Sequence, residues 1–130
     1  MNGLSLAYLG DAYFELEVRK YLLNLGITKI NSLHKEKVKF ASNVSQAKIM
    51  EYLLASDVLN TDEIDAYKKG RNAAHFSRKN LDMVTYQQAT GFESLIGYLS
   101  LNDEVRCKVI IGLAMEFIKQ GDGDGQRPTK

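Results

Sequence analysis

The segment LSLAYLGDAYFELEVRKYLLNL, residues 4–25, decides the fold of this 130-residue chain. It is apolar on most sides and ends at Gly26, so it predicts one long helix at the centre of a helical bundle. Within it, Leu9-Gly10-Asp11-Ala12 places a glycine and a carboxylate where an apolar helix is expected to have neither. Because glycine in a helix interior costs about 1 kcal/mol relative to alanine, Gly10 is expected to allow close contact with another helix.

A second phrase of the same kind, Gly91-Phe92-Glu93-Ser94-Leu95-Ile96-Gly97, lies near the other end of the chain. Glu93 precedes Gly97 by one helical turn. If Gly10 and Gly97 mark the crossing of their helices, Asp11 and Glu93 converge on one point. Two carboxylates held together either share a proton or bind a cation, and magnesium suits such a pair. Spacing alone leaves open the alternative that the two acids are unrelated surface or capping groups.

The remaining sequence predicts an all-α fold, because no segment shows the alternation of a strand. Residues 1–120 are expected to form one domain and residues 121–130, rich in glycine and charge, a disordered tail. The further helices are predicted over residues 31–54 in two pieces, 61–70, 80–101 and 105–119, with a basic loop at 71–79.

Composition indicates a soluble protein of a reducing compartment, which predicts a cytoplasmic location without membrane association. Cys107 is the one cysteine and lies in an apolar run, so it is expected to be a buried thiol. No apolar run reaches the roughly 18 residues of a membrane span. The N-terminus has no basic segment leading into a signal-peptide core.

Charge is unevenly distributed although the net charge is only +1. Residues 68–79 contain five basic side chains and no acid, and residues 28–48 contain five lysines against Glu36 alone. Such segments favour a polyanionic partner, although basic runs are most often only a solvated face.

Several other polar residues are expected to be structural. Glu15 and Arg19 stand at i, i+4 and should form an ion pair. The acids at 62, 63 and 65 follow a capping Asn60 and suit a helix start. His34 and His75 have no partners at metal-ligand spacing and are expected to be exposed.

The two acidic phrases, in this order, resemble the motifs of the ribonuclease III catalytic domain. Leu9-Gly10-Asp11-Ala12 with Glu15 is similar to the signature helix, and Phe92-Glu93-Ser94-Leu95-Ile96-Gly97 to the second acidic motif. The resemblance covers residues 3–119. With the Gly70-Arg71-Asn72-Ala73 phrase and no double-stranded-RNA-binding domain, the chain looks like the bacterial Mini-ribonuclease III subfamily.

The resemblance implies a homodimer that cleaves double-stranded RNA by magnesium-dependent phosphodiester hydrolysis. Asp11 and Glu93 would be the catalytic, Mg²⁺-binding pair, and Arg71, Arg78 and Lys79 would bind RNA. It further implies that the substrate is a large-subunit (23S) ribosomal RNA precursor, with ribosomal proteins as further partners.

At two positions this sequence lacks a carboxylate that the wider family has. Ala7 and Thr90 occupy positions where that family places an additional glutamate and aspartate. The losses fit the subfamily and leave the number of metal ions open. They are also compatible with an alternative function, in which the protein is a catalytically silent helical dimer that binds structured RNA as a ribosome-assembly factor. A protein–protein adaptor is a third possibility, and it predicts that Asp11 and Glu93 lie apart.

Overall fold

The structure is a computed structural model of the chain and describes residues 1–74 and 82–126. Within those ranges it consists of helices and their connections, which confirms the predicted all-α class. The helices, in chain order, are α1 Gly3–Asn24, α2 Ile30–Ala41, α3 Asn43–Ala55, α4 Thr61–Ala73, α5 Met83–Asn102 and α6 Glu104–Gln126. None of the described helices combines the length and hydropathy that crossing a bilayer requires.

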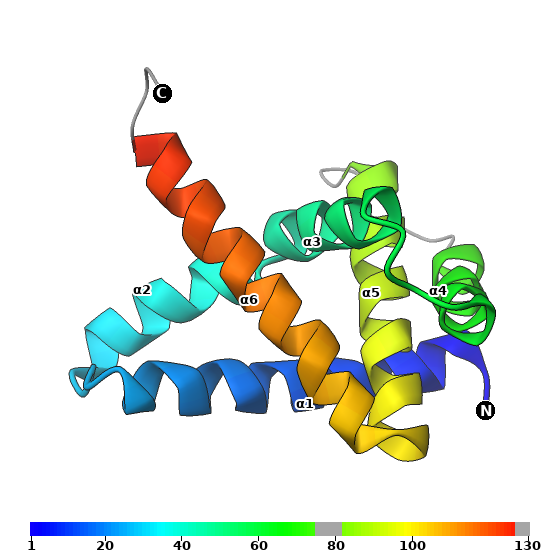
Figure 1. Cartoon of the computed structure of the whole chain (residues 1–130), viewed down its shortest axis with the longest axis horizontal. Helices are drawn as coiled ribbons and strands as arrows, with labels where there is room; N and C mark the ends of the chain where they lie inside the picture. The colour runs from blue at the N-terminus through cyan, green and yellow to red at the C-terminus, as the bar shows by residue number, and fades with distance from the viewer. Residues whose placement is uncertain (75–81, 127–130) are drawn as a thin grey trace.

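Helix α5 lies at the centre of the fold, where it packs against α1, α3, α4 and α6. Figure 1 shows α5 crossing the N-terminal half of α1, with α4 beside the N-terminal end of α1. The expectation that residues 4–25 form the central helix is wrong, because one face of α1 is exposed to solvent. Leu4, Tyr8 and Leu16 lie on this exposed face.

The buried face of α1 meets α5 along a regular stripe. Phe14 and Phe92 are both fully buried, and their rings meet edge to face with centroids 5.0 Å apart. Such a pair contributes about 0.5–1.5 kcal/mol beyond its burial. The buried positions of α1 lie on one face of the helix: Gly3, Leu6, Ala7, Gly10, Phe14, Val18 and Leu22.

Several helix ends differ from those predicted. The two-piece helix over 31–54 is confirmed, because Ser42 interrupts it and caps α3 by accepting a hydrogen bond from the Ser45 amide. Helix α4 continues past Gly70 to Ala73, so Arg71 lies in its last turn and not in a loop. Asp82, not Asn80, caps α5; Asn80 lies outside the described residues.

The last helix is also longer than predicted. Helix α6 extends beyond Lys119 to Gln126, because glycine lowers helix propensity without forbidding the conformation. The first strong helix breaker after Lys119 is Pro128. Residues 127–130, the end of the predicted disordered tail, lie outside the described residues.

An ion pair ties α4 to α6 beneath the surface. Arg106 donates from Nε to Glu63 Oε2 at 2.8 Å and from a terminal nitrogen to the Val58 carbonyl at 2.6 Å. Glu63 is 1% exposed and also completes a capping box with Asn60. Hydrogen bonding to the Arg106 guanidinium, which outweighs desolvation, holds the pKa of Glu63 below its usual value.

We expect Arg106→Leu to lower the free energy of unfolding by about 3–5 kcal/mol at neutral pH, because it leaves a buried carboxylate without its cation. The folded-state pKa of Glu63 is lowered, so the stabilisation is present above its unfolded pKa and lost as the pH falls through the folded value. Urea unfolding at neutral and acidic pH measures both effects.

Lys108→Leu is the matched control, since it removes an exposed cation that lies 3.4 Å from Glu17. It should cost no more than about 1 kcal/mol. Equal losses for the two variants would contradict the assigned role of Arg106.

Candidate active site

Two glycines bring the backbones of α1 and α5 into direct contact. A Cβ atom on Gly10 would lie 1.8 Å from the main-chain oxygen of Glu93. A Cβ atom on Gly97 would lie 2.0 Å from the oxygen of Leu6. Because no side chain larger than hydrogen fits at either position, the prediction that these glycines mark the helix crossing is confirmed.

This crossing brings Asp11 and Glu93 together. The Asp11 side chain is exposed, whereas Glu93 is half-buried beside the core. Burial is the main cause that raises the pKa of Glu93 to about 8, and the neighbouring Asp11 carboxylate and a hydrogen bond between the two side chains act in the same direction. The adaptor hypothesis predicts that these residues lie apart, and the structure contradicts it.

The two positions that lack family carboxylates adjoin this pair along their helices. Ala7 and Thr90 are both buried, and the Thr90 hydroxyl donates to the Tyr86 carbonyl at 2.9 Å. In the described part of the chain, no three His, Cys, Asp or Glu side chains gather where they could hold a metal. The candidate site therefore rests on two carboxylates.

A pair of touching carboxylates has two chemical options. It shares a proton, as the raised pKa of Glu93 indicates for the metal-free state, or a cation replaces that proton. A hard cation such as magnesium takes oxygen ligands, retains several waters, and completes its shell with substrate phosphate oxygens. Exposure of Asp11 leaves the pair open on the side from which a substrate could approach.

Glu15 has the structural role expected from its spacing. It accepts hydrogen bonds from Arg19, including one from Nε at 2.9 Å, and Lys37 approaches it at 3.5 Å. The Arg19 hydrogen bond is the main cause that lowers the pKa of Glu15. Glu15 thus links α1 to α2 through its ion pairs and is not part of the Asp11–Glu93 pair.

The predicted RNA-binding residues are only partly described. Arg71 extends its guanidinium over the Tyr67 ring, 5.3 Å from the centroid, at the end of α4. Arg78 and Lys79, together with His75, lie outside the described residues. Their part in the predicted site therefore stays a prediction.

One residue beside the carboxylates is missing from the sequence-based site. Gln46, near the start of α3, is 1% exposed and hydrogen-bonds to the Glu93 side chain. Its Nε2 also donates to the Ala41 carbonyl at 3.1 Å. The available signal is its place in an apolar helix, where a buried glutamine is uncommon.

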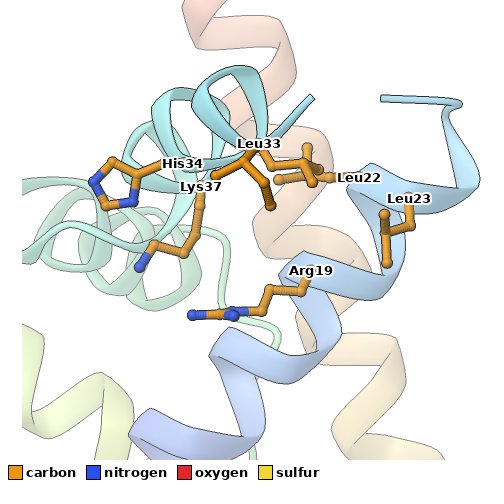
Figure 2. Close-up of a pocket in the computed structure, with 7 residues that line it drawn as sticks. Arg19, Leu22, Leu23, Leu33, His34 and Lys37 are labelled. Atoms are coloured by element: carbon orange, nitrogen blue, oxygen red, sulfur yellow. The ribbon is translucent and has the colours of Figure 1, made fainter. Parts of the chain in front are cut away.

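A separate pocket of about 230 Å³ lies between α1 and α2. Figure 2 shows apolar walls that include Leu22 and Leu33, with Arg19, His34 and Lys37 around them. Arg19 precedes the pocket's other α1 residues and lies about 12 Å along the helix from Asp11. The described residues that line this pocket include no Asp or Glu, so it offers no carboxylate to bind a metal ion.

Comparisons with known proteins agree with one another. The family model of the ribonuclease III domain matches residues 4–104. A protein named Mini-ribonuclease 3 from Acholeplasma laidlawii is 65% identical over 125 residues, which cover 96% of this chain and 100% of that protein. Mini-ribonuclease 3 from Enterococcus faecalis is 49% identical over 105 residues, or 80% of each chain. A crystal structure of a Fusobacterium nucleatum protein matches with a TM-score of 0.77 and 32% identity, over 89% of this chain and 93% of that one.

Proposed function

This chain belongs to the ribonuclease III domain family and is an endoribonuclease, and we propose that it hydrolyses double-stranded RNA with Mg²⁺ held by Asp11 and Glu93. The observation that carries the proposal is the contact of these two carboxylates at the glycine crossing of α1 and α5. Both residues lie within the region that matches the family.

The donor set fits magnesium. Mg²⁺ is commonly bound by one or two carboxylates, with water and phosphate oxygens as its remaining ligands. When bound, the ion would stabilise negative charge on the phosphate oxygens and on the departing 3′ oxygen. Asp11, the exposed member, would orient the attacking water and accept its proton. Glu93, anchored beside the core, would hold the ion in place.

The direct test is a gel assay of the purified protein on duplex RNA, single-stranded RNA and duplex DNA, with and without magnesium. We expect cuts in duplex RNA only, and their loss on addition of a chelator. If the protein binds structured RNA but does not cut it in the presence of any divalent metal ion, this result would support the alternative of a silent assembly factor.

RNA affinity is proposed to come from Arg71 at the end of α4 together with Arg78 and Lys79. Replacing Arg71, Arg78 and Lys79 by glutamine should weaken duplex RNA binding. It should also lower the slope of log Kd against log salt concentration by about one for each phosphate that the protein no longer neutralises. Fluorescence anisotropy without divalent metal measures both.

A control variant removes three exposed lysines elsewhere, Lys20, Lys108 and Lys119. The net charge changes equally, so a general electrostatic effect would change both slopes alike. A slope that changes only in this control would place the RNA-binding face elsewhere.

We further propose that the protein is a homodimer joined through the exposed apolar face of α1. Leu4 is 49%, Tyr8 84% and Leu16 50% exposed, and they lie on one side of the helix at four-residue multiples. A twofold pair of subunits would present one carboxylate site to each strand of a duplex.

In this arrangement Tyr8→Glu together with Leu16→Glu should convert the dimer to a monomer, because charge would be buried in an apolar contact. Light scattering coupled to gel filtration measures the mass. Ile30→Glu, at a position that is 76% exposed on α2, is the control and should leave the dimer intact. A wild-type protein of monomer mass would remove the dimer from the proposal.

The proposed physiological substrate is a large-subunit ribosomal RNA precursor, cut at base-paired ends. The similarity to the Mini-ribonuclease 3 proteins supports this choice. Mapping the ends of ribosomal RNA in cells depleted of the protein tests it, since unprocessed ends should accumulate. Mature ends under depletion would point to another duplex RNA.

A further inference from the structure

The glutamine beside Glu93 is difficult to explain by packing. Gln46 is 1% exposed, and its Oε1 is the single buried side-chain polar atom without a hydrogen-bond partner among the residues that the structure describes. A buried oxygen without a hydrogen-bond partner destabilises the folded state. Methionine or leucine would fill the same volume without that cost, so the amide group is expected to have another use.

The local structure fixes the direction of this amide. Ser42 caps α3, and the Ser45 hydroxyl donates to the Lys39 carbonyl at 2.5 Å, which closes the corner between α2 and α3. Gln46 follows directly, in the first turn of α3, and its Nε2 donates to the Ala41 carbonyl at 3.1 Å. The amide thus has one hydrogen on the end of α2 and another available for α5.

The second contact of the amide is with the site. From α3, the Gln46 side chain hydrogen-bonds to the Glu93 side chain on α5. An amide N–H that donates to a carboxylate restricts the orientation of that carboxylate, here Glu93 between α1 and α3.

We propose that Gln46 is a positioning residue, whose Nε2 hydrogen bond holds the Glu93 carboxylate in the orientation in which it binds the metal ion. This role rests on the proposed function of Asp11 and Glu93 as the metal pair. Gln46 touches neither substrate nor metal, and it acts through Glu93. Hydrogen-bond partners of metal ligands typically contribute 10- to 100-fold in metal affinity or activity.

The test is Mn²⁺ binding to the purified, RNA-free protein, followed by the electron paramagnetic resonance signal of the free ion. Gln46→Met should raise the Kd for Mn²⁺ about ten-fold. In the cleavage assay it should raise the Mg²⁺ concentration for half-maximal rate by a similar factor, while the rate at saturating Mg²⁺ approaches that of the wild type. Gln46→Leu is measured in parallel. It should show the same effects, and it replaces Gln46→Met if that variant does not fold.

Ser45→Ala is the matched control, since it loosens the same corner without touching Glu93. If Gln46 only closed that corner, Gln46→Met and Ser45→Ala would change metal binding alike, and this result would overturn the proposal. Glu93→Gln tests separately whether Glu93 binds the metal ion at all. Mn²⁺ binding that is unchanged in Glu93→Gln would refute the metal pair itself, and the role of Gln46 with it.

Discussion

Asp11→Asn is expected to abolish cleavage of duplex RNA, with a fall in rate of at least about a thousand-fold. Asparagine has the shape of aspartate but no negative charge, so it would bind the cation weakly and could not accept a proton from the attacking water. A metal ion contributes several kcal/mol to transition-state stabilisation in such sites, and about 4 kcal/mol corresponds to a thousand-fold change in rate.

The fold should survive this change, because Asp11 is exposed and its loss removes a repulsive charge beside Glu93. Thermal melting and RNA affinity without metal should therefore stay close to the wild-type values. Asp65→Asn, an exposed acid on α4, is the control and should cleave normally. Cleavage by Asp11→Asn at more than a few per cent of the wild-type rate would rule out the assigned role of this carboxylate.

Gly10→Ala is expected to lower both the stability and the activity of the protein. The new methyl carbon would stand 1.8 Å from the Glu93 main-chain oxygen and 2.7 Å from the Gly97 nitrogen, so the two helices would have to separate. Overpacking typically costs about 1–3 kcal/mol, and a clash with main chain should cost about 3 kcal/mol or more. The melting temperature should fall by roughly 10 °C.

Separation of the helices should also reduce cleavage, because it moves Asp11 away from Glu93. Gly112→Ala is the control: this glycine lies within α6, and a Cβ atom there would meet nothing within 4 Å. Alanine at that position should stabilise the protein by up to about 1 kcal/mol. Equal melting temperatures for the two variants would show that the crossing is not as close as described.

The α1–α5 crossing can be predicted from the sequence because a glycine inside a helix has few explanations. Gly10 and Gly97 each carry an energetic cost, and each stands about one turn or less from an acid. Those local facts are sufficient to suggest that Asp11 lies near Glu93. The pairing of the two helices themselves becomes specific through the resemblance to a known family.

The same reasoning is wrong at Gly70, where it predicts the end of a helix. In the structure Gly70 lies inside α4, where a Cβ atom would come within 2.4 Å of the Ser94 Cβ atom on α5. Glycine serves both as a helix terminator and as a point of close approach, and one sequence does not distinguish these uses. The sequence therefore predicts a loop for Arg71, although this residue belongs to a helix.

Contacts between residues that lie far apart in the sequence also cannot be predicted from local spacing. The capping role of Glu63 follows from its distance to Asn60, but its ion pair with Arg106 joins residues that only the tertiary fold brings together. Gln46 likewise becomes notable only after α3 is placed against α5. Local spacing identifies caps and helix faces, whereas burial depends on the whole chain.

The glycine crossing has a practical consequence for engineering this protein. The separation of the two acid-bearing turns is set by main-chain atoms in contact, Gly10 against the Glu93 carbonyl and Gly97 against the Leu6 carbonyl. A designer who redesigns the interior for heat resistance should therefore keep these two glycines, which set the separation of the helices, together with Gln46, which is proposed to orient Glu93.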